Sequence, residues 1–113
     1  MTERGHALSD RIMDLQQNAQ QLHCPDPFAF QVQTAFTAGR PLICIFAAAI
    51  AVRTLAPVLT DKYQDPPVLV LDEAGDYVVP LLGGHQAGAN RWAAHLADQL
   101  NAEVVITTAH SYA

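Results

Sequence analysis

Two strand–loop–helix units dominate this 113-residue chain from Pro41 onward. The first begins with the continuous apolar run from Pro41 to Phe46, and the second with the short run from Tyr77 to Pro80. A continuous apolar run is typical of a strand that is buried on both faces, which requires helices on both sides of the sheet. The sequence therefore predicts an α/β fold.

Periodicity and turn signals predict the other elements. Apolar residues at helical spacing indicate an amphipathic helix over residues 4–22, and Asp26 followed by proline in a first turn indicates a second helix over 26–38. Further helices are expected near 50–56 and 90–100, strands at 68–71 and 103–107, and a hairpin turn at 72–76. The order α-α-β-α-β-β-α-β predicts a single domain, residues 1–113, with a mixed, mostly parallel sheet of about four strands flanked by helices.

Composition excludes several classes of protein. Half of the residues are apolar and 15% are charged, so most of the chain is not disordered. The net charge of -5 provides no basic stripe for nucleic acid. Cys24 and Cys44 are too few for a disulfide framework or a zinc site, so we expect no metal site. Because no run approaches the roughly 20 apolar residues of a membrane span, and Met1 to His6 lack a signal-peptide core, we expect a cytoplasmic protein without membrane contacts.

A glycine-rich stretch from Leu81 to Asn90 is the main candidate for a working site. Gly83, Gly84 and Gly88 permit close approach of a ligand to the backbone, and the helix that follows presents unpaired N–H groups and a positive dipole end. Such a place suits phosphate or carboxylate. His85 could exchange a proton there near neutral pH. The alternative is that the glycines only turn the chain and His85 is solvated.

Charged residues near the expected strand ends are the second set of candidates. Arg53 follows the first buried strand, where open α/β sheets bind ligands, although it could equally be a surface residue or a partner of Asp72 or Glu73. Glu73 could orient His85 or activate water, provided that the hairpin folds toward the glycine-rich stretch; the alternative is turn chemistry and solvation. We expect the loops at Ala47 and Gly83 to lie at one edge of the sheet.

Several ordered stretches between residues 41 and 109 carry a family resemblance. They are Ile50-Ala51-Val52-Arg53 with Ala56-Pro57, Lys62 with Asp65-Pro66, Val70-Leu71-Asp72-Glu73-Ala74-Gly75, Leu81-Leu82-Gly83-Gly84-His85 with Gly88-Ala89-Asn90, and Val105-Ile106-Thr107-Thr108-Ala109. In order and spacing they resemble the N-terminal domain of the cobalamin-biosynthesis protein G (CbiG) family. The sequence departs from the usual family pattern at Ala49 and Ala87, where a methyl group replaces glycine and narrows an anion pocket.

The resemblance implies cobalt-precorrin-5A hydrolase chemistry, in which the lactone of a corrin precursor is opened and acetaldehyde is released. The expected catalytic residues are His85 and Glu73, and the expected substrate-binding residues are Arg53, Lys62, Gly83, Gly84, Gly88 and Asn90. His85 fits the base, while the loop N–H groups and Asn90 fit the donors to a developing oxyanion. No separate cofactor is expected, since the substrate carries the cobalt.

The expected partners are the corrin-ring intermediate and either other domains of the same enzyme or a precorrin methyltransferase, with a homodimer as a further assembly. The alternative function is a non-catalytic corrinoid-binding or accessory domain associated with a precorrin-3B C17-methyltransferase. A phosphate- or nucleotide-binding module rests on the glycine-rich stretch alone, which lacks the lysine-serine/threonine ending of a P-loop.

Overall fold

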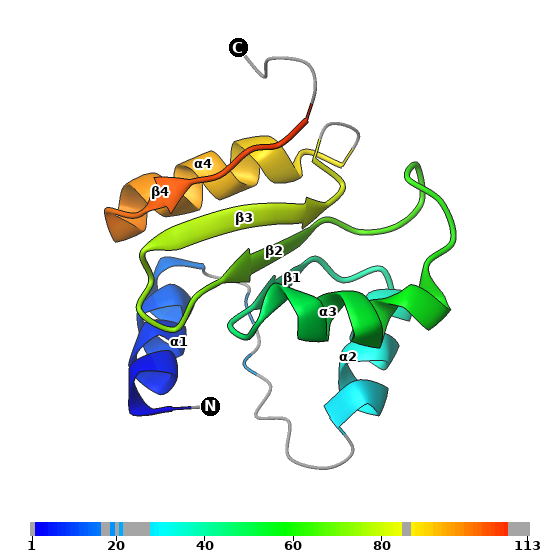
Figure 1. Cartoon of the computed structure of the whole chain (residues 1–113), viewed down its shortest axis with the longest axis horizontal. Coiled ribbons are helices and arrows are strands. Elements are labelled where there is room, and N and C mark those ends of the chain that lie inside the picture. Colours follow the sequence, from blue (N-terminus) through cyan, green and yellow to red (C-terminus); the bar gives the residue numbers. More distant parts are fainter. Residues whose placement is uncertain (1, 17–18, 20, 22–27, 85–86, 109–113) are drawn as a thin grey trace.

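The computed structural model describes residues 2–16, 19, 21, 28–84 and 87–108. Its elements are α1 (Glu3–Leu15), α2 (Phe28–Thr37), β1 (Leu42–Cys44), α3 (Ala48–Leu55), the short 3₁₀ helix η1 (Ala56–Val58), β2 (Val68–Leu71), β3 (Tyr77–Leu82), α4 (Ala89–Leu100) and β4 (Glu103–Val104) (Figure 1). The predicted order of helices and strands is confirmed. The one addition is η1, in which Pro57 lies in the first turn, where its missing N–H group costs nothing.

The four strands form one mixed sheet in the order β1-β2-β3-β4. β1 pairs with β2 in parallel, β2 with β3 in antiparallel, and β3 with β4 in parallel. Two of the three pairings are therefore parallel, as the sequence predicted. Each parallel pair is joined through a helix, α3 in the first case and α4 in the second, whereas β2 and β3 are joined by a short turn.

The turn between β2 and β3 determines where the strand ends lie. Asp72 accepts hydrogen bonds at Oδ1 from the N–H groups of Asp76 (3.0 Å) and Tyr77 (2.9 Å), and Gly75 has a φ of 73° that suits the turn. The chain therefore reverses direction. Cys44 at the end of β1 lies level with Val70 and the middle of β3, not with the end of β3.

This reversal corrects one prediction. Ala47 follows the end of β1, whereas Gly83 follows the end of β3, and these two strands run in opposite directions. The two loops consequently lie at opposite ends of the sheet (Figure 1). The expectation that they share one edge is wrong because it treated both strand–loop–helix units as parallel members of one sheet. We call the two ends the glycine-loop end and the acidic-turn end, after residues 83–88 and residues 72–76.

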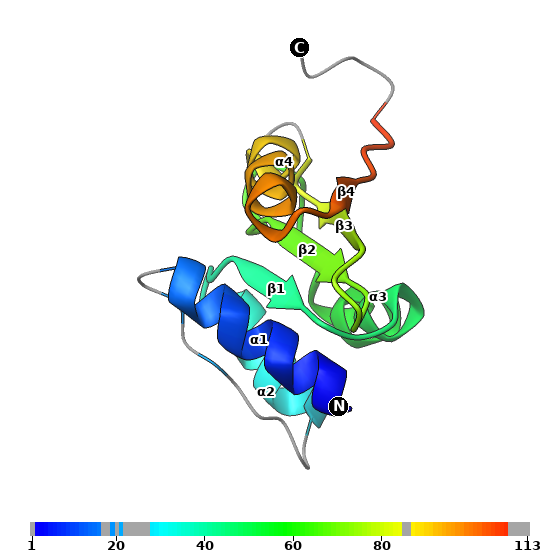
Figure 2. The ribbon, with the colours of Figure 1, turned by 90° about the vertical axis from the view of Figure 1, so that its left-hand side faces the viewer.

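Helices cover both faces of the sheet, and each face has its own hydrophobic core. Helices α1 and α4 pack on one face with the first cluster, and α2 and α3 pack on the other with the second. In Figure 2, α4 and α3 lie on opposite sides of the strands. The first cluster comprises Leu8, Ile12, Ile45, Leu69, Leu71, Val78, Ala89, Ala93, Leu96, Ala97 and Leu100, and the second comprises Val32, Phe36, Cys44, Ala51, Leu55, Val68 and Val70.

Several elements are shorter than the sequence predicted. Helix α1 starts where the hydroxyl of Thr2 accepts a hydrogen bond from the N–H of Gly5 (3.2 Å), and it ends at Leu15 rather than near residue 22. Gln16 takes an extended conformation there, and residues 17, 18, 20 and 22 lie outside the described part of the chain. None of the helices in the described part has the length and apolar content of a membrane span.

Candidate functional site

The glycine-rich loop joins β3 to α4 through two glycines with left-handed backbone angles. Gly83 has a φ of 75°, and Gly88, the residue before α4, has a φ of 79°. The carbonyl of Gly83 accepts hydrogen bonds from the N–H groups of Ala87 (3.2 Å) and Ala89 (3.0 Å). No side chain caps the start of α4, so the positive end of this twelve-residue helix is left to the loop and to any ligand.

Gly83 is also confined by its neighbours. A Cβ atom at this position would come within 2.9 Å of the Ala87 Cβ and within 3.1 Å of the Pro67 Cα. The loop therefore packs against the segment that leads into β2, and the Ala87 methyl occupies space beside Gly83. The methyl group of Ala87, where the family pattern has glycine, therefore lies directly beside Gly83 in the loop.

Asn90, in the first turn of α4, points into the protein rather than toward solvent. It is 5% exposed, and its Nδ2 donates to the Thr108 hydroxyl at 3.1 Å. Its Oδ1 has no hydrogen-bond partner among the described residues. A buried carbonyl without a partner costs on the order of 1–3 kcal/mol. In this arrangement Asn90 does not present a donor to a substrate in solvent, which is the role that the sequence suggested for it.

Thr108 is the residue at this end that sequence reasoning missed as a site residue. It follows β4, and because β4 is parallel to β3, the segments after these two strands emerge at the same end of the sheet. That topological signal was available from the expected β3-α4-β4 unit. His85, the expected base, and Gln86 lie outside the described residues, so the role of His85 stays a prediction.

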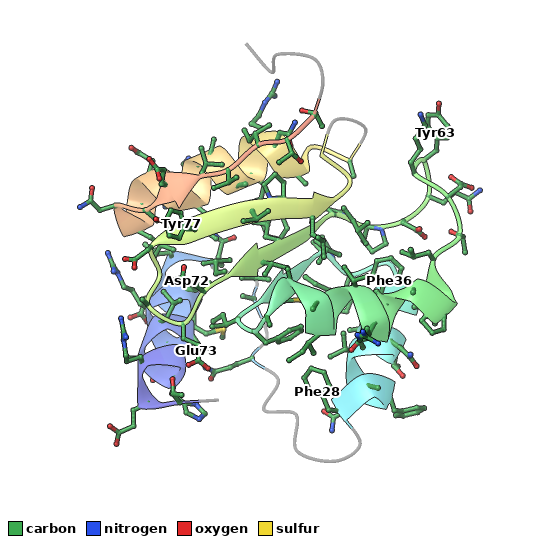
Figure 3. All side chains as sticks on the ribbon, viewed as in Figure 1. Phe28, Phe36, Tyr63, Asp72, Glu73 and Tyr77 are labelled. Carbon is green, nitrogen blue, oxygen red and sulfur yellow. The ribbon has the colours of Figure 1, made fainter. Side chains whose placement is uncertain are left out.

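Lys62 belongs to the glycine-loop end. It lies in the loop before β2, whose last residue before the strand, Pro67, contacts Gly83. The Nζ atom of Lys62 is 5.3 Å from the centroid of the Tyr63 ring, a cation–π contact. Tyr63 is 71% exposed, and Figure 3 shows it well away from the acidic turn.

Arg53 lies in the last turn of α3 and is exposed to solvent. Since α3 starts beyond the end of β1 and returns along the sheet to the start of β2, its last turn lies toward the glycine-loop end. A cation at this position also interacts favourably with the negative end of the helix dipole. Within the described residues Arg53 forms no ion pair, and the structure does not bring it to Asp72 or Glu73.

Glu73 lies at the opposite end of the sheet. Its carboxylate accepts hydrogen bonds from the hydroxyl of Thr2 and from the Thr2 N–H (3.3 Å). These two bonds lower the pKa of Glu73 below its ordinary value, against a smaller opposing effect of desolvation, and the charge of Arg4 makes a still smaller contribution in the same direction as the bonds. Glu73 thus anchors the start of α1.

The separation of Glu73 from the glycine-rich loop follows from the length of β3. Six residues of strand lie between the acidic turn and Gly83, which corresponds to roughly 20 Å at about 3.3 Å per residue. Figure 3 shows Asp72 and Glu73 beside α1, on the other side of the molecule from Tyr63. The hairpin therefore does not fold toward the loop, and the condition on which Glu73 was expected to assist His85 is not met.

A hollow of about 2010 Å³ runs along the outer edge of β1. Its lining is mostly apolar and includes Ile12 of α1, Phe28 of α2 and Ile43 of β1. Of the predicted site residues in the described part of the chain, Glu73 lines this hollow, and Ala87 of the glycine-rich loop also does. Arg53, Lys62 and Gly84 do not line it, so the hollow is separate from the cations and from Gly84. The described residues also contain no group of three or more His, Cys, Asp or Glu side chains placed to bind a metal ion.

Comparison with known proteins identifies the family. Residues 31–111 match the family model described as Cobalamin synthesis G N-terminal. The chain belongs to this family. A cobalt-precorrin-5A hydrolase of Salmonella typhimurium is 51% identical over 82 residues, which are 73% of this chain and 23% of that protein. A cobalt-precorrin-5A hydrolase of Priestia megaterium is 43% identical over 74 residues, 66% of this chain and 20% of that protein.

The CbiG N-terminal fold is also recognisable among solved structures. A cobalamin biosynthesis protein G homolog from Sulfolobus solfataricus superimposes with a TM-score of 0.68 over 94% of this chain and 34% of that protein, at 23% sequence identity. This likeness supports the fold. The chain spans less than a quarter of the length of the two hydrolases.

The glycine-loop end of this CbiG N-terminal domain has the parts of an anion site. It combines the start of α4, which no side chain caps although the N–H groups of Ala89 and Asn90 donate to the carbonyls of Gly83 and Gly84, with the backbone of Gly88 and the cation of Lys62. The last turn of α3 is directed toward the same end. Such a set can hold a carboxylate by N–H donors and by charge. The acidic-turn end combines carboxylates with the uncapped start of α3, and its one turn glycine, Gly75, precedes a strand rather than a helix.

Proposed function

We propose that this chain contributes to cobalamin biosynthesis as part of a cobalt-precorrin-5A hydrolase, and that its glycine-loop end holds the corrin-ring substrate. The observation that carries this proposal is the 51% identity over 82 residues with the Salmonella typhimurium enzyme of that name. Both hydrolase relatives support a hydrolase in preference to an accessory domain of a methyltransferase.

The chemistry of the substrate fits the glycine-loop end. A corrin precursor carries several peripheral carboxylates, which the start of α4 and the cations Lys62 and Arg53 can bind. The overall charge of -5 opposes a polyanionic ligand, so binding depends on these cations lying near the loop. Glu73 does not belong to this set, because its carboxylate is engaged with Thr2 at the far end of β3.

Lactone opening requires a base that activates water and donors that stabilise the oxyanion. In our proposal His85 is the base, and the donors are backbone N–H groups of the loop rather than the Asn90 side chain, which is turned toward Thr108. The protein supplies no cofactor, since the cobalt arrives with the substrate. Other domains of the same enzyme complete the site, and the complex works in the cytoplasm; a homodimer is a further prediction.

A chimera tests the proposal directly. Residues 31–111 of this chain replace the matching segment of the Salmonella typhimurium hydrolase, and the purified protein is mixed with cobalt-precorrin-5A. We expect release of acetaldehyde. Replacing His85 with Gln in the chimera should lower turnover about 10²-fold or more, because the group that titrates near neutral pH is lost.

A binding measurement on the chain itself accompanies the chimera. Trp92 is the single tryptophan, and a corrinoid bound near the start of α4 should quench its fluorescence. His95, which is exposed on α4, provides the matched control, and replacing it with Gln should change neither signal. An inactive chimera together with unquenched Trp92 would contradict the proposed function.

A further inference from the structure

Side chains from two distant segments meet at the start of α4. The Asn90 Nδ2 donates to the Thr108 Oγ1 at 3.1 Å, although the two residues are 18 positions apart. Strands β3 and β4 are parallel, so the segments that follow them emerge side by side. The contact therefore links the glycine-rich loop, the helix that follows it, and the chain beyond β4.

The side chains of Asn90 and Thr108 both lie against Gly84. A Cβ atom on Gly84 would come within 2.8 Å of the Asn90 Oδ1 and within 3.3 Å of the Thr108 Cγ2. In addition, the carbonyl of Gly84 accepts a hydrogen bond from the Asn90 N–H at 2.9 Å. Gly84 is thus held from its backbone and covered by the two side chains, which leaves little freedom for the peptide groups beside it.

The burial of Asn90 assigns it a role within the protein. A side chain that is 5% exposed cannot reach a large substrate in solvent, whereas it can determine the position of the backbone that does. Its carbonyl is buried without a hydrogen-bond partner among the described residues. A buried acceptor without a donor is costly, so the presence of the carboxamide at this place indicates that its contact with Gly84 has a role.

We propose that Asn90 and Thr108 form a polar latch that positions Gly84, and with it the start of α4, for binding the substrate. Both are positioning residues and touch no substrate atom. The part of this inference that concerns substrate rests on the proposed function. The part that concerns the loop does not, because the latch is made entirely of this chain's own residues.

Three variants distinguish the effect of the Thr108 hydroxyl group from the effect of its branched shape. Thr108→Val removes the hydroxyl and keeps the branched shape, including the methyl group near Gly84. Thr108→Ser keeps the hydroxyl and removes the methyl group. Thr107→Val is the matched control, since Thr107 and Thr108 are both exposed, but Thr107 makes no contact with Gly84 of the kind that Thr108 makes.

Amide hydrogen exchange in the full chain, without substrate, measures the latch. The reporters are the N–H groups of Ala89 and Asn90, which donate to the carbonyls of Gly83 and Gly84. In Thr108→Val we expect both amides to exchange about tenfold faster, as follows from the loss of one hydrogen bond. Thr108→Ser should restore slow exchange, and Thr107→Val should resemble the unaltered chain.

Kinetics of the chimeric hydrolase provide the second readout. Thr108→Val should lower kcat about tenfold while KM changes less than about twofold, because misplaced donors weaken the transition state more than ground-state binding. A variant that was only less stable would show neither this split nor rescue by serine.

Each outcome bears on the latch. Unchanged exchange of Ala89 and Asn90 in Thr108→Val would overturn it, as would equal acceleration in Thr107→Val. Uniform acceleration of all slow amides, or failure of Thr108→Val to fold, would show a general stabilising role and would also overturn it. If the exchange results are as expected but no corrinoid is bound or hydrolysed, the latch stands and the proposed function fails.

Discussion

The reason for glycine at position 84 differs from the reason for glycine at positions 83 and 88. Gly83 and Gly88 have positive φ angles, as the sequence suggested for the whole stretch, whereas Gly84 is not among the positive-φ glycines. At Gly84 the Asn90 carboxamide occupies the volume that a side chain would need. The sequence could predict the first reason, which is local. The second depends on the burial of Asn90 against a segment 18 residues away, which no local pattern shows.

The first prediction concerns Gly84→Ala. The new methyl group would meet the buried Asn90 Oδ1 at 2.8 Å, so we expect a loss of about 1–3 kcal/mol in the free energy of unfolding, the usual range for an overpacked site. Gly39→Ala is the comparison, since no atom lies within 4 Å of a Cβ there and only the φ of 83° opposes it; its cost should be about 1–2 kcal/mol. Urea unfolding measures both.

A double-mutant cycle identifies the cause of the Gly84 effect. If the carboxamide is the obstacle, Asn90→Ala should reduce the cost of Gly84→Ala, and the two changes should be non-additive by on the order of 0.5 kcal/mol or more. Strictly additive costs would contradict the contact. Gly39→Ala combined with Asn90→Ala should be additive, because these residues belong to different elements.

The second prediction concerns the pH dependence of stability. Hydrogen bonds from Thr2 hold the pKa of Glu73 below 4.5 in the folded protein, so the stability that Glu73 contributes is present above its unfolded pKa and is lost as the pH falls through the folded pKa. Glu73→Gln should therefore lower stability at neutral pH, and the difference from the unaltered chain should shrink as the pH falls below about 4.

Chemical denaturation at a series of pH values measures this effect. Because Glu73 lies at the surface and is half-exposed, salt should weaken its contribution. Glu103→Gln is the control, as the described residues provide no hydrogen bond to its side chain. A Glu73→Gln difference that stays constant from neutral to acidic pH would show that the hydrogen bonds of Thr2 do not stabilise the carboxylate.

At the scale of elements, the sequence predicted which helices and strands exist and in which order. Strong periodicity in α4 and the continuous apolar run of β2 made these reliable. The ends of elements were less predictable: β1 is confined to Leu42–Cys44 although the apolar run extends to Phe46, and α1 stops at Leu15. Strand ends depend on hydrogen bonds to a neighbouring strand, which periodicity does not encode.

The larger difference between the predicted and the observed fold concerns the relative direction of β1 and β3. The acidic turn was correctly predicted as a hairpin, and a hairpin makes its two strands antiparallel. A hairpin here places the ends of β1 and β3 at opposite ends of the sheet, whereas the sequence-based prediction assigned residues from both ends to one site. The structure divides them: Gly83, Gly84, Gly88, Asn90 and Lys62 belong to one end and Glu73 to the other.

The third prediction tests this division. Lys62→Ala and Arg53→Ala should each weaken binding of cobalt-precorrin-5A about tenfold, since each removes a charge-assisted contact. Glu73→Gln should leave the dissociation constant unchanged. Arg4→Ala is the control for lost positive charge, because Arg4 lies on α1 near Glu73. Quenching of Trp92 measures binding in each case. Equal losses in Arg4→Ala and Lys62→Ala would show that overall charge, and not this end of the sheet, governs affinity.

At the scale of the whole molecule, one sheet separates two hydrophobic clusters. The buried strand residues alternate between them: Leu69 and Leu71 face the first cluster, and Val68 and Val70 face the second. All four are at most 5% exposed. Because both clusters are built on β2, loss of packing on one face should loosen the strand that supports the other.

The last prediction is that the two clusters unfold together. Phe36 of α2 is 2% exposed in the second cluster, and Leu96 of α4 is fully buried in the first. Phe36→Ala should lower the free energy of unfolding by about 3–5 kcal/mol and Leu96→Ala by about 2–5 kcal/mol. Phe30→Ala is the matched control on α2, since Phe30 is 65% exposed, and it should change stability by less than about 0.5 kcal/mol.

Two probes distinguish joint from separate unfolding. Trp92 packs against the first cluster, so its fluorescence reports that face, while far-ultraviolet circular dichroism reports all helices and strands. In a cooperative domain, Phe36→Ala shifts both transitions to the same lower urea concentration, even though Phe36 lies on the face away from Trp92. If the fluorescence transition stayed in place while the dichroism transition moved, the second cluster would unfold independently. The start of α4, which lies on the same face as Trp92, would then be insulated from changes in α2 and α3.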